Sequence, residues 1–391
     1  MKYNDIEPAD RVSRIKEYYF SRKLREIAEL RAKGADIISL GIGGPDLPPA
    51  PAVVDALCES AHRPDTHSYQ PYVGIPELRR AYADWYERHY GVTLDADKEI
   101  QPLIGSKEGI LHVSMAFLNP GDGVLVPNPG YPTYSSVSNL VGADIYTYDL
   151  TEENGWMPDF DALEEMPLEL IKLMWVNYPN MPTGTPASRE LFEKLVDFGA
   201  RHNIVIVHDN PYSFILNDKP LSILSVPGAK DIAIEFNSLS KSHNMAGWRM
   251  AMVASNPTFI SWILKVKSNI DSGQFRPMMM AACEALHLPD SWYAEVNRVY
   301  AGRRRVAEQI ALATGSSFDA GQRGLFLWCK VPDSFASGEE LADKLLYEAN
   351  VFVTPGIVFG SQGKRYFRIS LCTPVATMEE ALRRVQSVMQ S

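Results

Sequence analysis

A lysine among small hydroxyl residues is the side chain of this sequence best suited to covalent chemistry. Lys241 follows Ser238 and Ser240 and precedes Arg249. A lysine amine attacks carbonyl groups once it has lost its proton, and a nearby cation lowers its pKa. Hydroxyl groups and an arginine can hold a phosphate beside that amine. These residues therefore predict a site at which a lysine bonds covalently to a carbonyl group on a phosphate-bearing molecule.

An aspartate and a tyrosine lie upstream of this lysine, as Asp209 and Tyr212. A carboxylate beside a pyridine ring keeps the ring nitrogen protonated, and the protonated ring then draws electrons from a bonded substrate. Aspartate is also a common turn residue after a strand, so Asp209 taken alone fits either use. Together with Lys241 and Arg249, it supplies what a pyridoxal phosphate site requires.

Short apolar runs rich in strand-forming residues alternate with helical patterns along most of the chain. This alternation predicts an α/β fold with a mostly parallel sheet buried on both faces. The candidate site residues follow these runs, and ligands of such sheets bind beyond the carboxyl ends of the strands. The runs are 37–40, 102–104, 124–126, 171–176, 204–207, 232–236 and 250–254.

The last part of the chain changes character and predicts a smaller α+β domain. Strands are expected over 324–330 and 366–371, with a helix over 338–348 between them. The helical pattern over 18–33 is expected to join them. The predicted organisation is a large cofactor-binding domain over 45–280 and a small domain formed by 1–44 and 281–391.

Composition argues against several classes of function. The 391 residues carry 38 Lys+Arg and 48 Asp+Glu, and the net charge of −10 disfavours a surface for nucleic acid or anionic membranes. No stretch approaches the roughly 18 apolar residues of a membrane span, and the N-terminus lacks the apolar core of a signal peptide. The 4 cysteines show no metal-site spacing, so no metal is expected. These features predict a cytoplasmic protein.

Several motifs in a fixed order make the chain resemble the class I aminotransferases, which belong to the pyridoxal phosphate enzymes of fold type I. The resemblance covers nearly the whole chain and is to the branch of alanine, aspartate and LL-diaminopimelate aminotransferases. It implies that pyridoxal 5′-phosphate forms a Schiff base with Lys241, which then moves the proton of the substrate α-carbon. It further implies that Asp209 pairs with the ring nitrogen and that Tyr212 donates to the ring oxygen O3′. These three residues are the expected catalytic set.

The resemblance also assigns a phosphate cup. Gly105, Ser106 and Lys107 lie where a helical pattern begins, and the exposed N–H groups of a helix N-terminus favour an anion. Without the resemblance, these residues would indicate only a helix start. The remaining members of the cup are Ser238, Ser240 and Arg249.

Two tyrosines match further contacts of the cofactor. Tyr131, in the Pro- and Gly-rich segment 127–132, matches the residue that stacks on the pyridine ring. A turn is predicted in this segment whether or not the tyrosine stacks. Tyr69 matches a tyrosine that reaches the phosphate of the partner subunit, so a homodimer with shared active sites is expected.

Arg368 and Gly43 match the residues that bind the substrate α-carboxylate. The planar donors of an arginine hold a carboxylate bidentately, and a glycine allows the backbone N–H to approach it. The glycines at 41, 43 and 44 do not continue into a G-x-G-x-x-G loop, and Pro45 interrupts a helix start. A dinucleotide site is therefore rejected.

One position departs from the family pattern. Met181 lies where the family has an asparagine that bonds O3′ and helps to hold the substrate carboxylate. A thioether cannot donate a hydrogen bond. Either Asn180 shifts to take this role or Tyr212 bonds O3′ alone, and we expect Asn180 to turn away from the ring.

The expected reaction is transamination, in which an L-amino acid gives up its amino group and a 2-oxo acid, 2-oxoglutarate or pyruvate, receives it. A lyase that cleaves a C–S bond would use the same cofactor site, because the outcome depends on which α-carbon bond stands perpendicular to the ring. A non-catalytic cofactor-binding regulatory module is a third alternative. Such modules carry a DNA-binding domain, for which the residues before 37 leave no room. The sequence leaves the amino donor open.

Overall fold

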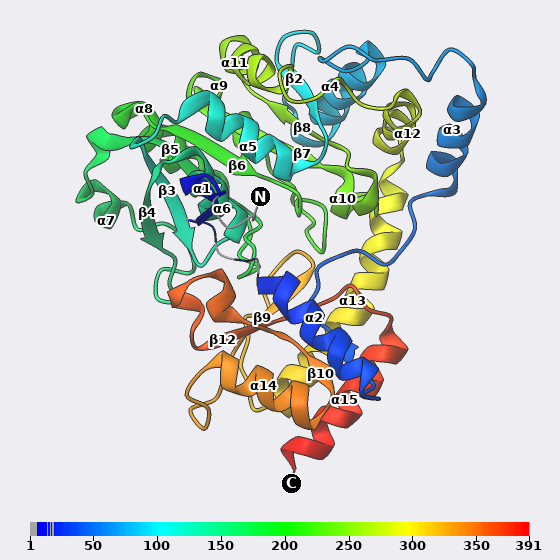
Figure 1. Ribbon diagram of the computed structural model, residues 1–391, viewed down its shortest axis with the longest axis vertical. Coiled ribbons are helices and arrows are strands. Elements are labelled where there is room, and N and C mark those ends of the chain that lie inside the picture. Colours follow the sequence, from blue (N-terminus) through cyan, green and yellow to red (C-terminus); the bar gives the residue numbers. More distant parts are fainter. Residues whose placement is uncertain (1–5, 14, 16, 18, 391) are drawn as a thin grey trace.

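The computed structural model describes residues 6–13, 15, 17 and 19–390, which form two regions. The upper region in Figure 1 contains the larger sheet, and the lower region contains two small sheets. Helix α13 (Asp290–Ala313) runs from one region into the other. A cavity described below lies between the two regions.

The large region is built on a seven-stranded sheet with the order β2-β8-β7-β6-β5-β3-β4. Strand β8 runs antiparallel to β2 and β7, and the other neighbouring pairs are parallel. Helices cover both faces, so the inner strands are buried along nearly their whole length rather than at alternate residues. The strands are β2 (Ile100–Leu103), β3 (Gly123–Asn128), β4 (Asp144–Asp149), β5 (Ile171–Val176), β6 (Val205–Asp209), β7 (Ala233–Ser238) and β8 (Ala251–Ala254).

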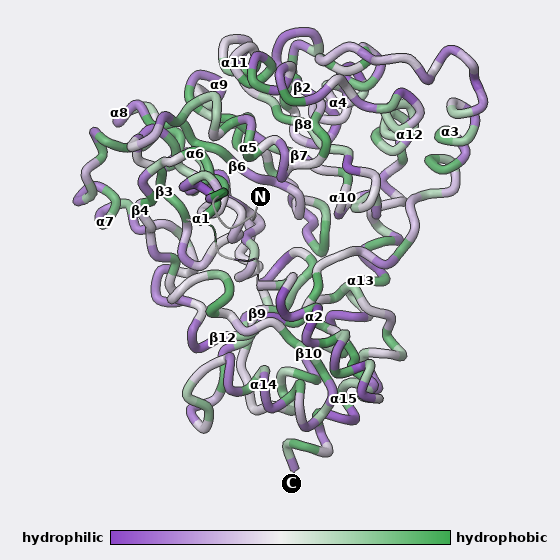
Figure 2. The backbone as a smooth tube through the Cα atoms, viewed as in Figure 1, coloured by the Kyte–Doolittle hydropathy of each residue, from purple (hydrophilic) through white to green (hydrophobic). Residues whose placement is uncertain are grey.

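Alternate residues of each strand enter different cores, as the two-residue period of a strand requires. In β3, Val124 and Val126 pack with residues of α5, α6 and α11, whereas Leu125 packs with residues of α4, α8 and α12. Figure 2 shows apolar residues concentrated in the sheet and mixed with polar residues along the helices. The helices of this region are α3 (Pro51–His62), α4 (Pro76–Tyr90), α5 (Ser106–Phe117), α6 (Pro132–Val141), α7 (Phe160–Glu164), α8 (Arg189–His202), α9 (Ala229–Ile232), α10 (Leu239–Ser242), α11 (Pro257–Lys267) and α12 (Arg276–Leu286), with α1 (Asp10–Ser13) close to α6.

The small region combines an antiparallel sheet of the order β11-β12-β9 with a parallel pair, β1 and β10. Its core surrounds Trp328 and Phe367, which are almost fully buried. The strands are β1 (Ile38–Ser39), β9 (Phe326–Lys330), β10 (Val351–Phe352), β11 (Thr354–Pro355) and β12 (Tyr366–Ser370). The helices are α2 (Tyr19–Ala32), α14 (Gly338–Glu348) and α15 (Val375–Met389).

The α/β fold with a mostly parallel sheet is confirmed, with two differences in detail. The run at 37–40 predicts a strand among those of the main sheet, but β1 pairs with β10 and Leu40 packs in the core of the small region. Strand β4 has no counterpart among the predicted runs, because this edge strand is largely exposed and lacks a continuous apolar stretch. The domain boundaries at 45 and 280 remain a prediction. Within the described residues, no helix has the length and apolar character to cross a membrane.

Candidate active site

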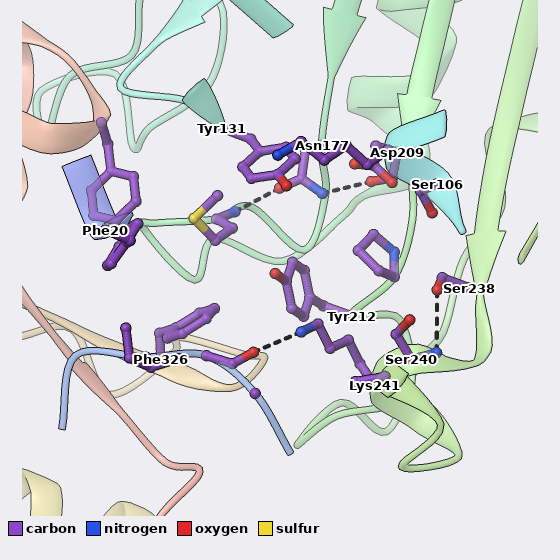
Figure 3. Close-up of a pocket in the computed structure, with 18 of the residues that line it drawn as sticks. Phe20, Ser106, Tyr131, Asn177, Asp209, Tyr212, Ser238, Ser240, Lys241 and Phe326 are labelled. Carbon is purple, nitrogen blue, oxygen red and sulfur yellow. Dashed lines mark hydrogen bonds between the residues drawn. The ribbon is translucent and has the colours of Figure 1, made fainter. Parts of the chain in front are cut away.

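The carboxyl ends of the strands bring most of the predicted site residues to one cavity of about 390 Å³. Asp209 ends β6, Ser238 ends β7, and Lys241 lies in the short helix α10 that follows directly. Figure 3 shows these side chains directed into the same space from adjacent strands. The predicted residues that line it are Gly43, Ser106, Lys107, Tyr131, Asp209, Tyr212, Ser238, Ser240, Lys241, Arg249 and Arg368.

Lys241 reaches across the cavity from the large region to the small one. Its Nζ donates a hydrogen bond to the carbonyl oxygen of Gly43 at 2.6 Å. Burial lowers the pKa of Lys241, and the charges of Arg368 and Arg249 lower it further, against opposing effects of Cys372 and Asp209. A lowered pKa increases the fraction of neutral amine, which is the nucleophilic form.

Asp209 lines the cavity, and its two carboxylate oxygens differ in their surroundings. Oδ2 accepts a hydrogen bond from the hydroxyl of Tyr134 at 2.9 Å, whereas Oδ1 is buried with no partner among the described residues. Burial raises the pKa of Asp209 to about 6, although the Tyr134 hydrogen bond and the charges of His208 and Lys241 act in the opposite direction. A buried acceptor without a partner is costly, so Oδ1 is suited to a donor on a bound molecule.

Tyr134 and Asn177 position Asp209, a role that the sequence-based prediction gave to neither residue. Tyr134 is fully buried and stacks on Trp175, with ring centroids 4.9 Å apart. Asn177 donates to the backbone oxygen of Asp209 at 2.6 Å and lines the cavity. The three-residue spacing between Tyr131 and Tyr134 at the start of α6 was the available signal, because such residues share a helix face.

The predicted phosphate cup lies at one end of the cavity. Gly105 has φ of +81°, which favours glycine, and a Cβ added there would lie 1.9 Å from Nη2 of Arg249 and would displace that guanidinium. Ser106 begins α5, and its buried Oγ has no partner among the described residues. Ser238 accepts a hydrogen bond from the backbone N–H of Ser240 at 3.2 Å. The arrangement combines a helix N-terminus, hydroxyl groups and a cation, which suits an anion.

Arg368 occupies the other end and has different surroundings. Its guanidinium carbon lies 3.7 Å from the ring centroid of Phe326 and 4.6 Å from that of Phe359. Nη2 donates to the carbonyl oxygen of Gly41 at 3.0 Å, and Nη1 donates to the thioether sulfur of Met181 at 3.2 Å. With 4% of its surface exposed, Arg368 is a buried cation facing the cavity, which suits a carboxylate.

The segment around Met181 shows what each asparagine does. Asn180 turns away from the cavity, because its Oδ1 accepts hydrogen bonds from the backbone N–H and hydroxyl of Thr183. Its Nδ2 donates to the backbone oxygen of Asn177 at 3.1 Å. Met181 instead faces the cavity, and its backbone N–H donates to Oδ1 of Asn177 at 2.7 Å. The amide that lines the cavity is therefore Asn177.

Two predicted residues do not line the cavity of this chain. Gly105 precedes Ser106 at the start of α5 and lies against the guanidinium of Arg249. Tyr69 lies before α4 with 89% of its surface exposed. Phe275, which is also exposed, contacts His67 at a centroid distance of 5.9 Å. The predicted use of Tyr69 concerns a partner subunit and remains a prediction.

Comparison with known proteins agrees with this geometry. Residues 35–385 match the family model described as aminotransferase class I and II. The LL-diaminopimelate aminotransferase of Aquifex aeolicus is 42% identical over 385 residues, covering 98% of this chain and 99% of that protein.

Solved structures give the same result. The apo-BacF structure from Bacillus subtilis is 37% identical, with a TM-score of 0.93 and coverage of 98% of both chains. A single mutant of Thermus thermophilus aspartate aminotransferase is 25% identical, with a TM-score of 0.91, and the match covers 98% of this chain and 100% of that one. The chain therefore belongs to the class I and II aminotransferases, enzymes that transfer an amino group between an amino acid and a 2-oxo acid.

Proposed function

We propose that this aminotransferase works with pyridoxal 5′-phosphate bound covalently to Nζ of Lys241. The observation that carries the proposal is that Lys241 and Asp209 line one cavity together with Ser106 and Arg249, and that the buried Oδ1 of Asp209 has no partner among the described residues. A protonated ring nitrogen would satisfy Oδ1, and a phosphate would satisfy the buried Oγ of Ser106. The close approach of Gly105 to Arg249 supports the same assignment, since it brings a cation to the helix N-terminus.

The chain's own groups would divide the work as follows. When bound, the cofactor supplies a ring that withdraws electrons from the α-carbon of the substrate. Lys241 would accept the α-proton and return it, because its lowered pKa increases the fraction of free amine that can act as a base. Asp209 would hold the positive charge of the ring nitrogen. Tyr212, whose pKa is raised by burial, would remain a hydroxyl donor to O3′.

Arg368 would bind the α-carboxylate of both substrates. Its guanidinium faces the cavity from β12, and the backbone of Gly43 lies beside it, in hydrogen-bond contact with Lys241. A carboxylate held at Arg368 places the α-amino group within the space between that arginine and Lys241. Tyr131 is proposed to stack on the cofactor ring, and Lys107, Ser238 and Ser240 to complete the phosphate cup.

A homodimer with shared active sites is part of the proposal. Tyr69 is far more exposed than is usual for a tyrosine, and Tyr72 and Phe275 add further exposed aromatic surface. We propose that Tyr69 contacts the phosphate bound by a second copy. The name of the relative from Aquifex aeolicus makes LL-diaminopimelate a candidate donor, with 2-oxoglutarate or pyruvate as acceptor.

Reduction with borohydride, followed by proteolysis and mass spectrometry, tests the assignment of the cofactor. The expected result is one reduced adduct, on the peptide that contains Lys241, in protein that absorbs as a bound pyridoxal phosphate. An adduct on another lysine would contradict it. Release of ammonia and pyruvate from cystathionine without an added oxo acid would instead indicate a lyase.

A further inference from the structure

The charged groups of the cavity are all used by the proposed function, on which this inference rests. Among the described lining residues, the charged side chains are Lys107, Asp209, Lys241, Arg249 and Arg368. The first four serve the cofactor, and Arg368 serves the α-carboxylate. None of these five is therefore left to meet a second charge on the far end of a substrate.

The wall around Arg368 is apolar. Phe326 and Phe359 lie against the guanidinium of Arg368, and the ring centroid of Phe20 lies 5.9 Å from the guanidinium carbon. Leu24 and Ile42 extend this wall, and Leu24 has 48% of its surface exposed. Figure 3 shows Phe20 and Phe326 on the side of the cavity opposite Asp209 and Ser106.

Met181 continues the wall on the side of Arg368 that faces the large region. The Nη1–Sδ contact of 3.2 Å fixes the thioether beside the carboxylate-binding group. An amide at this position would offer polar atoms to a substrate, whereas a thioether offers a polarisable apolar surface that packs well against aromatic rings.

The energetic consequence follows from burial. A carboxylate placed against these rings would lose its water without gaining a partner, which is unfavourable. An apolar side chain would lose contact with water and gain packing, which is favourable. We propose that the amino acid accepted by this site has an uncharged apolar side chain, aromatic or branched aliphatic. LL-diaminopimelate, with a second ammonium and a second carboxylate, fits this wall poorly, and pyruvate fits it better than 2-oxoglutarate.

Two measurements on the pyridoxal phosphate-loaded enzyme test the proposal. The first is calorimetric binding of two unreactive acids, 3-phenylpropanoate and glutarate. The second is the single-turnover rate of cofactor conversion, followed by absorbance, for L-phenylalanine, L-leucine, L-glutamate and LL-diaminopimelate. The proposal expects at least tenfold tighter binding of 3-phenylpropanoate, and at least tenfold higher kcat/KM for the apolar amino acids.

Variants at Met181 test whether the apolar wall around Arg368 causes the preference for apolar substrates. Met181→Asn is expected to reduce the ratio of kcat/KM for apolar amino acids to kcat/KM for charged ones at least fivefold. Met181→Leu should keep this ratio within about twofold of the wild type. Met115→Asn, on the exposed face of α5 outside this cavity, is the matched control. If Met181→Asn does not retain cofactor, the two wild-type measurements decide the question by themselves.

Equal or tighter binding of glutarate, or faster reaction of LL-diaminopimelate or L-glutamate, would overturn the inference. Such a result would show that a charge from outside the described wall reaches the substrate. The proposed function fails separately: in that case no amino acid of either class converts the cofactor, and borohydride leaves no adduct on Lys241. The ratio of the affinities for the two unreactive acids, measured on the protein as purified, still tests the wall in that event.

Discussion

At one end of the cavity, Ser106, Asp209 and Arg249 present polar and charged atoms from strand ends and a helix N-terminus. At the other end, the single cation Arg368 lies between the rings of Phe326 and Phe359. The first end is suited to hold one molecule in a fixed pose, since each polar atom has a defined direction. The second end offers one directional contact, at Arg368, and an apolar surface that should bind apolar substrate side chains more tightly than charged ones. The difference separates cofactor retention from substrate choice, and substitutions at the two ends should have separable effects.

The largest effect is expected at Lys241, which serves both ends. Lys241→Ala removes the covalent attachment and the base for the α-proton, so turnover should fall by at least about a thousandfold. Pyridoxal phosphate should still bind non-covalently at the polar end, as measured by fluorescence titration. Lys265→Ala, at an exposed lysine of α11, is the control. Retention of substantial turnover by Lys241→Ala would remove this residue from the mechanism.

Substitution at the apolar end should weaken substrate binding and leave cofactor binding unchanged. Arg368→Lys keeps the charge but loses the planar pair of donors, so KM for every α-amino acid should rise about ten- to hundredfold. Cofactor content should not change. Arg304→Lys, at a buried arginine of α13 that donates to the backbone oxygen of Gln322, is the matched control. Loss of cofactor with an unchanged KM would place Arg368 in the cofactor site or the fold.

The polar end should show a pH dependence that originates at Asp209. Burial raises the pKa of Asp209 to about 6, so the carboxylate becomes neutral as the pH falls below that value. A neutral Asp209 no longer attracts a protonated ring nitrogen, and the affinity for pyridoxal phosphate should fall between about pH 7 and pH 5. Asp209→Asn should bind more weakly at pH 8 and lose this part of the dependence. Parallel titration curves for the two proteins would contradict the assignment.

A smaller effect is expected from the residue that holds Asp209 in place. Tyr134→Phe removes the hydrogen bond to Oδ2 but keeps the ring stacked on Trp175. The loss of one such bond, about 0.5–1.5 kcal/mol, should weaken cofactor binding about two- to tenfold and raise the pKa of Asp209, since that bond lowers it. Tyr82→Phe is the control, because the Tyr82 hydroxyl is equally buried and has no partner among the described residues. Identical cofactor affinity in both variants would mean that Tyr134 only packs.

The two ends also differ in how far the sequence could predict them. Lys241, Asp209 and Ser106 each follow an apolar run that predicts a strand. Because the carboxyl ends of parallel strands lie at the same edge of a sheet, these residues are expected to lie close together. Phe326 and Phe359 look like ordinary core residues in sequence, and only the packing of the small region against the large one places them beside Arg368. The contact of Met181 with Arg368 joins residues 187 positions apart and depends on the same packing. Tyr134 carried a local signal, its spacing from Tyr131, but the distance to Asp209 depends on the position of α6 over the sheet.

The measurement that tests the central claim most directly is a crystal structure of the protein with pyridoxal 5′-phosphate. The account predicts a continuous bond from Nζ of Lys241 to the cofactor, with the ring nitrogen in hydrogen-bond contact with Oδ1 of Asp209. It also predicts the phosphate at Ser106 and Arg249, and a substrate carboxylate at the guanidinium of Arg368. A phosphate bound at Arg368, or a ring nitrogen turned away from Asp209, would contradict the assignment of the two ends.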